Sequence, residues 1–325
     1  MSTRNHIISD TTAAYLDGLD MTAIPSKSDI ALDIVTATNN AIELYNATVP
    51  KGGSKYQYIT DLMPDQLAQV LTRLHHVCRI PCGGVNASPS MDLLGIYMED
   101  GPDSGTYVTD DDNLKRVMRQ YNPGLRMKEV DETVDILRDN APRVARCEDP
   151  DLIAVNNGIF DYKTKTLRDF TPDLIFLTKS RIDYKPNPVN PVIHNADDDT
   201  DWDVEGWMRE LSDDPEIVNL FWEILGAIIR PFVPWNKSAW FYSNTGNNGK
   251  GTLCALMRNL CGPGSWASIP LSDFSKDFML EPLTRSSAII VDENDVGGFI
   301  DRAANIKAVI TGDALLINRK FKAAI

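Results

Sequence analysis

The sequence predicts an α/β protein in which an N-terminal α+β domain is followed by a domain of alternating strands and helices. The first observation is the length of 325 residues, which is enough for two domains with separate cores. The second is that segments with alternating apolar and polar residues, at 91–110 and 151–170, are separated by helical patterns. The third is the order of an apolar run, a glycine-rich loop and a helical pattern within residues 238–260. Strands are therefore expected in both parts of the chain.

The first part of the chain is expected to combine helices with a strand hairpin. Apolar residues recur at helical spacing over 65–78, which predicts a helix with Cys78 on its apolar face. Residues 91–110 predict two short strands around an Asp-Gly turn. Helical spacing returns over 112–121 and 128–140. This region therefore reads as α+β.

A second strand-rich passage follows, and then a change in composition. Residues 151–170 alternate on both sides of a turn, and residues 174–184 predict another strand. Residues 185–203 hold three prolines and then an aspartate-rich run, so we expect a linker there. The expected domains are a helical segment of unassigned role, an α+β domain and a third domain that carries the loop, over residues 1–85, 86–190 and 191–325.

The third domain begins with helices and continues with a buried strand. Residues 203–232 are rich in Trp and Leu and predict two helices. The apolar run at 238–244 predicts a buried strand that leads directly into the glycine-rich loop, and residues 251–260 predict the helix after it.

The net charge of −14 is distributed unevenly along the chain. Residues 230–325 hold 11 Lys and Arg against 8 Asp and Glu, whereas the preceding residues hold 21 against 38. Phosphate binding needs Lys and Arg, so the basic balance around the loop is compatible with a DNA-facing module joined to an acidic one. A solvated acidic surface explains the rest.

The five cysteines and the lack of long apolar runs indicate the cellular environment. An odd number of cysteines suits free thiols in a reducing cytoplasm better than a disulfide framework. No stretch approaches the roughly 18 apolar residues that a spanning helix needs, so we expect no membrane association. The cluster of His75, His76, Cys78 and Cys82 lacks the paired spacing of zinc sites, and we do not assign zinc to it.

The segment "SNTGNNGKGT" over 243–252 has the features of a phosphate-binding loop. Such a loop directs backbone N–H groups and the dipole of the next helix at the phosphates. Gly246 and Gly249 give the backbone freedom, and Lys250 gives a charge for the β- and γ-phosphates. The pattern G-x-x-x-x-G-K-S/T is missed where Asn244 replaces a glycine and Gly251 replaces the hydroxyl residue. The residues expected to bind ATP are Thr245, Gly246, Asn247, Asn248, Gly249, Lys250, Gly251 and Thr252. An ordinary turn between a strand and a helix remains open for the loop alone.

A second feature lies about forty residues further on. Residues 286–295 predict a buried strand that delivers Asp292 and Glu293 at its carboxyl end, where ligands bind in open α/β sheets. Asp292 would hold Mg2+ through its waters, and the hydroxyl of Thr252 would assist. Glu293 would orient or deprotonate the attacking water, so Glu293 and Lys250 are the candidate catalytic residues.

The ordered set "GNNGKGT", "AIIVDEND" and "IKAVITGDALLINRKFK" resembles the ATPase of superfamily 3 helicases. It is most similar to the phage and plasmid primase-helicase family related to the poxvirus primase-helicase. Residues 155–188 are similar to the domain that precedes the helicase in that family. The resemblance covers roughly residues 90–325 and implies an AAA+-like P-loop ATPase domain of the additional-strand class.

The resemblance also implies partners and further site residues. It implies a homo-oligomeric ring, a hexamer, that acts on single-stranded or forked DNA during replication in the cytoplasm of a bacterial or archaeal host cell. Gly312, Asp313 and the following basic residues fall on a segment that leads to a channel hairpin. The side chains of "LLINRKFK" mix positive charge with an aromatic face, which suits a single-stranded backbone. The residues expected to bind DNA are Lys307, Arg319, Lys320 and Lys322.

Two other functions remain open beside an ATP-driven helicase or translocase. A nucleotide kinase also uses "GKGT", and phosphoryl transfer to nucleoside monophosphates would reveal it. A module that loads on DNA with bound nucleotide but does not unwind would fail a strand-displacement assay.

The end of the chain at "NRKFKAAI" carries one more expectation. In additional-strand ATPases a later strand lies between the loop strand and the acidic strand, and it ends in a polar residue that senses the γ-phosphate. We expect the ATPase domain to be incomplete here, so that the chain is a truncated piece of a longer protein with weak ATP binding and negligible hydrolysis.

Overall fold

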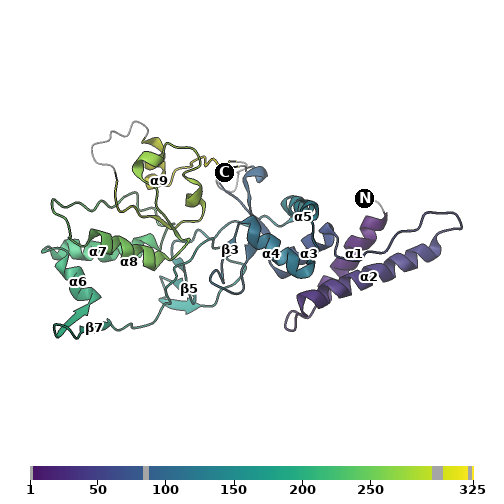
Figure 1. Cartoon of the computed structure of the whole chain (residues 1–325), viewed down its shortest axis with the longest axis horizontal. Coiled ribbons are helices and arrows are strands. Elements are labelled where there is room, and N and C mark those ends of the chain that lie inside the picture. Colours follow the sequence, from purple (N-terminus) through teal and green to yellow (C-terminus); the bar gives the residue numbers. More distant parts are fainter. Residues whose placement is uncertain (1–2, 83–87, 295–302, 321–323) are drawn as a thin grey trace. The chain divides into compact units, whose positions relative to one another are not determined.

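The computed structural model describes residues 3–82, 88–294, 303–320 and 324–325. These residues form two compact units, the first made of residues up to 82 together with 92–145, and the second of residues 88–91 and those from 146 onward. In Figure 1 the first unit carries the long helices α1 and α2, and the second carries α6 to α9. The structure is mixed helix and sheet, as an α/β protein requires.

The first unit packs its helices mainly against one another and also contains a small antiparallel sheet in the order β1-β2-β3. Its described elements are α1 (Thr3–Asp17), α2 (Lys27–Thr48), α3 (Pro64–Leu74), β1 (Cys78–Ile80), β2 (Leu93–Tyr97), β3 (Tyr107–Val108), α4 (Asp111–Tyr121) and α5 (Met127–Asn140). The strands expected over 91–110 and the helices expected over 112–121 and 128–140 are confirmed.

The core of this unit follows from residues spaced four apart on α1 and α2. On α2 the side chains of Ile30, Ile34 and Ile42 are fully buried. The same stripe carries Thr38, which accepts a hydrogen bond at Oγ1 from the Nε2 of Gln66 on α3 (3.0 Å). A buried polar group costs little when it is hydrogen-bonded, so this contact fixes the register of the helices within the core.

The helix predicted over 65–78 ends earlier than expected. His76 has a φ of 49°, in the left-handed region, so α3 ends at Leu74 and the chain turns. Cys78 therefore begins β1 and is not on a helix, which corrects the prediction. Cys78 pairs with Gly95 across the antiparallel ladder and is buried there.

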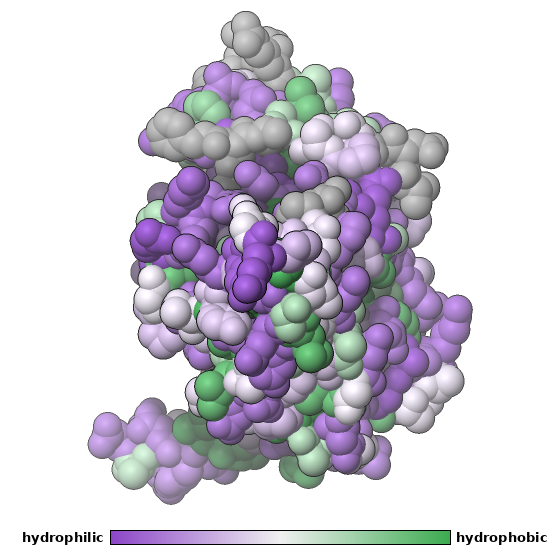
Figure 2. All heavy atoms as spheres, turned by 90° about the vertical axis from the view of Figure 1, so that its right-hand side faces the viewer, coloured by the Kyte–Doolittle hydropathy of each residue, from purple (hydrophilic) through white to green (hydrophobic). Residues whose placement is uncertain are grey.

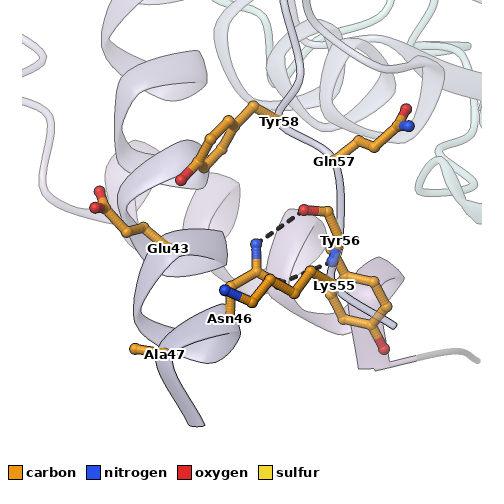
Figure 3. Close-up of a pocket in the computed structure, with 7 residues that line it drawn as sticks. All are labelled: Glu43, Asn46, Ala47, Lys55, Tyr56, Gln57 and Tyr58. Carbon is orange, nitrogen blue, oxygen red and sulfur yellow. Dashed lines mark hydrogen bonds between the residues drawn. The ribbon is translucent and has the colours of Figure 1, made fainter. Parts of the chain in front are cut away.

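Two asparagines of α2 hold an extended segment against the helix. Asn46 donates from Nδ2 to the carbonyl oxygen of Tyr56 and accepts at Oδ1 from the Tyr56 N–H, both at 2.8 Å. Asn39, two turns earlier, makes the same pair of bonds with Ile59, at 2.9 and 2.8 Å. Figure 3 shows the Asn46 bonds beside an open hollow of about 590 Å³ that this segment lines with α2. We call this arrangement the asparagine clamp.

The surface visible in Figure 2 has hydrophobic residues interspersed with hydrophilic ones. Apolar side chains exposed singly are normal on folded proteins and indicate no docking site by themselves.

The second unit contains small sheets, with helices between and after them. Its described elements are a 3-10 turn (Pro89–Met91), β4 (Leu152–Val155), β5 (Gly158–Asp161), β6 (Thr166–Arg168), β7 (Val192–Asn195), β8 (Thr200–Asp203), α6 (Val204–Glu210), α7 (Pro215–Ile228), α8 (Lys250–Cys261), β9 (Trp266–Ala267), 3-10 turns at Leu271–Asp273 and Glu281–Thr284, β10 (Ala288–Ile289) and α9 (Ala304–Thr311). The strands expected over 151–170 and the helices expected over 203–232 and 251–260 are confirmed.

Two expected features of this unit differ in the structure. Residues 174–184 form no strand, because their backbone bonds to the chain near β4 are isolated, as in Ser180 N–H to the Ala154 carbonyl (2.9 Å). The expected linker at 185–203 contains the exposed antiparallel hairpin of β7 and β8.

Candidate nucleotide-binding site

The loop before α8 has the backbone that its glycines allow. Gly249 caps α8 with a φ of 82°, and Asn247 also has a positive φ of 55°. The positive φ favours glycine there, and a Cβ would also lie 2.5 Å from the end of the Leu211 side chain, which would have to shift. Lys250 is the first residue of α8 and donates from Nζ to the Oδ1 of Asn248 (2.7 Å).

The rest of the loop is exposed, and its own hydrogen bonds shape it. Asn248 donates from Nδ2 to the carbonyl oxygen of Thr245 (2.5 Å), which closes the turn around Gly246. A Cβ on Gly246 would meet nothing within 4 Å, so the space beside it is open. Gly251 and Thr252 are exposed in the first turn of α8. The predicted loop residues thus form a turn in front of a helix N-terminus.

The segment before the loop corrects the sequence prediction. Residues 238–244 form no strand among the described residues, and Trp240 and Tyr242 are 68% and 86% exposed. A strand needs a neighbouring strand for its backbone groups and a surface for its side chains. No described strand pairs with this segment, and the strand before Asp292, β10, forms a two-stranded parallel sheet with β9. The expected buried strand is therefore wrong.

Asp292 lies beside the first turns of α8. It follows β10, and Ile290 between them is buried in the core formed with α7 and α8. A Cβ built on Gly251 would lie 3.8 Å from both carboxylate oxygens of Asp292. The Asp292 side chain is 48% exposed, so it is open to solvent. The structure thus brings together two predicted site residues that are about forty positions apart in the sequence.

The face of α8 toward Asp292 also carries Arg258, which the sequence analysis missed. Its Nη1 lies 4.0 Å from the Oδ2 of Asp292, and its guanidinium lies 5.1 Å from the centroid of the Trp266 ring. The Arg258 Nε is buried and has no hydrogen-bond partner among the residues that the structure describes. The sequence signal that could have identified Arg258 was its spacing of seven residues from Gly251, because this spacing places the two residues on one face of a helix.

The same geometry affects the Cys254 thiol between these two residues. Burial raises the pKa of Cys254, and the negative charge of Asp292 raises it further, against the opposing charge of Arg258. Cys254 is therefore a buried thiol of the helix face and no nucleophile.

Glu293 and the basic residues lie on segments after β10. Glu293 is exposed next to Asp292. Lys307 is exposed on α9, which ends at Gly312 with a φ of 75°. Beyond α9 the backbones of Ile317 and Ile325 bond reciprocally (2.7 and 3.1 Å), so the chain returns on itself. Arg319 is half-buried and Lys320 is exposed in this returning segment, while Lys322 lies outside the described residues.

The residues near the loop fit a hydrated magnesium ion better than a caged metal. Within the described ranges, no three His, Cys, Asp or Glu side chains gather as a metal site. The Asp292 carboxylate lies near the space beside Gly251, and Thr252, the next residue of α8, is exposed. Mg2+ keeps several waters and is usually held by one or two carboxylates plus substrate phosphates. In the histidine and cysteine cluster over residues 75–82, the Nε2 of His75 forms a hydrogen bond with the Tyr121 hydroxyl (2.9 Å).

Comparison with known families shows which family the chain belongs to. Residues 37–214, more than half of the chain, match the family described as D5 N terminal like. The chain belongs to this family. The match supports the phage and plasmid primase-helicase family that the resemblance indicated, and D5 N-terminal-like proteins are associated with phage and plasmid replication. It begins at residue 37, so it includes part of the segment 1–85 that had no match by resemblance.

The loop region matches a different family. Residues 241–325 match a family of unknown function, DUF5906. No curated protein matches the chain. None of the helices in the part of the chain that the structure describes is long and apolar enough to cross a membrane.

Proposed function

We propose that the protein binds ATP with Mg2+ at residues 245–252 and uses its hydrolysis to move along DNA during phage or plasmid replication. The observation that carries this proposal is the Asp292 carboxylate, 3.8 Å from the Cβ position of Gly251 in the first turn of α8. A carboxylate in front of a glycine-rich loop and helix N-terminus is the arrangement that magnesium and phosphates require. Membership of a replication-associated family supports the same proposal.

The roles of the residues follow from their chemistry. Lys250, which donates to Asn248 Oδ1 at the start of α8, would neutralise the β- and γ-phosphates. Asp292 and Thr252 would hold the ion, which shields the developing phosphate charge when bound. Glu293 would act as the general base toward water.

The DNA-binding part of the proposal rests on charge. Lys307, Arg319, Lys320 and Lys322 would line the path of single-stranded DNA in a ring of identical subunits. Phosphate neutralisation by such residues needs no base-specific geometry. The replicating element would use this motor in the cytoplasm of its bacterial or archaeal host.

The test of nucleotide binding is Lys250→Ala, with Lys237→Ala as its charge-matched control. Lys237 is exposed and lies before the loop. A fluorescent ATP analogue with Mg2+ should lose about 100-fold in affinity for Lys250→Ala, which is about 2.7 kcal/mol. The control should bind as the unmodified chain does. Equal affinity of all three proteins would contradict the proposal.

A further inference from the structure

Position 251 is where phosphate-binding loops usually carry a hydroxyl residue, and the structure shows what the glycine leaves there. Among the described residues, and apart from the chain neighbours and backbone of its own helix, a Cβ on Gly251 would meet the two carboxylate oxygens of Asp292 within 4 Å, each at 3.8 Å. That distance is ordinary van der Waals contact. The φ of Gly251 is not positive, so its backbone would accept any L residue. Neither strain nor crowding requires glycine at this position.

The space beside Gly251 faces the carboxylate of Asp292. A serine hydroxyl on that Cβ could approach Asp292 to hydrogen-bonding distance, since O–H to O contacts span roughly 2.5–3.0 Å. Without the hydroxyl, a water molecule can occupy the same place and donate to the carboxylate. The Asp292 side chain is open enough to solvent for this exchange.

We propose that Gly251 sets how the protein holds its metal ion, by reserving the place of the usual hydroxyl ligand for a water of Mg2+. The ion then contacts Asp292 and the start of α8 through water. This inference rests on the proposed function, because it concerns the same ATP site. It predicts that the chemistry of the side chain at 251 matters more than its size.

The test compares Gly251→Ala with Gly251→Ser by titrating Mg2+ against binding of a fluorescent ATP analogue. The methyl group of the alanine displaces the water and supplies no ligand, so the half-saturating Mg2+ concentration should rise about tenfold. The serine supplies an oxygen in the same place, so its Mg2+ requirement should equal or fall below that of the unmodified chain. The affinity of each protein measured with a chelator in place of Mg2+ is the reference against which its Mg2+ requirement is compared.

The outcomes separate this inference from the proposed function. Both variants should unfold at or above the temperature of the unmodified chain, because alanine and serine suit a helix better than glycine does. Equal shifts of the Mg2+ requirement in the two variants, or no shift in Gly251→Ala, would overturn the inference alone. An unmodified chain that binds ATP no better than Lys250→Ala would overturn the proposed function, and this inference with it.

Discussion

The helical N-terminal unit and the segment that carries the loop bury their apolar side chains to very different extents. On α2, Ile30, Ile34 and Ile42 are 0% exposed, whereas Trp240 and Tyr242 before the loop are 68% and 86% exposed. Burial of apolar surface is the main favourable term in folding. The comparison teaches that α2 is anchored in a hydrophobic core, whereas the segment that leads into the loop buries little of its apolar surface and depends on α8 for its place.

The largest expected effect on this comparison comes from the core of the first unit. Leu71 is fully buried in its hydrophobic cluster. Leu71→Ala should lower the free energy of unfolding by about 2–5 kcal/mol, because it removes buried methyl groups and leaves a cavity. Trp240→Ala should change it by less than about 0.5 kcal/mol. Denaturant unfolding of both variants measures the difference, and similar losses would break the comparison.

Acid should act on the first unit through His75. Burial mainly, with the charges of Lys27 and His76, lowers the pKa of His75 to about 4. In the unfolded chain its pKa is about 6.5, so protonation favours the unfolded state. The contribution of neutral His75 to the free energy of unfolding is complete above pH 6.5 and is lost as the pH falls toward 4. The loss should reach up to about 3 kcal/mol.

The measurement is denaturant unfolding at several pH values, followed by tyrosine fluorescence. His75→Gln should flatten the pH dependence between 6.5 and 4, since glutamine does not titrate. His6→Gln is the control, because His6 is exposed on α1. If the exposed histidine accounts for the acid sensitivity as much as His75 does, the burial argument is wrong.

The smallest effect concerns DNA and should leave stability unchanged. Replacing Lys320 and Lys322 with alanine should reduce the slope of DNA affinity against salt by about one unit per lost phosphate contact. Lys185→Ala is the control, because Lys185 is exposed and lies far from Lys320 and Lys322 in the sequence. Fluorescence anisotropy with a single-stranded oligonucleotide at several salt concentrations gives the slopes. An unchanged slope would show that Lys320 and Lys322 do not contact DNA phosphates.

The sequence predicted those elements whose signal lies within one short window. Helix α4 has Asp110 as an N-cap and apolar residues on one face, so pattern and capping agree. The order of loop and helix at Gly249 and Lys250 was likewise readable, because glycine and lysine have local roles there.

The failures come from contacts that no short window contains. The expected strand at 238–244 depended on a neighbouring strand, and no described strand pairs with these residues. The end of α3 depended on the left-handed backbone of His76, which is a rare conformation for a residue other than glycine. The approach of Arg258 to Asp292 is tertiary, so its spacing on α8 had meaning only once the acidic strand was placed beside that helix.

The asparagine clamp has a consequence for how the surface of the first unit can change. Asn39 and Asn46 bind only main-chain atoms of Ile59 and Tyr56, which every residue except proline presents alike. Mutations at Lys55, Gln57 or Tyr58 therefore alter the lining of the hollow in Figure 3 without releasing the segment from the helix. The side chains that line the hollow can therefore vary during evolution while the backbone that carries them stays in place, as antibody loops vary on a constant framework.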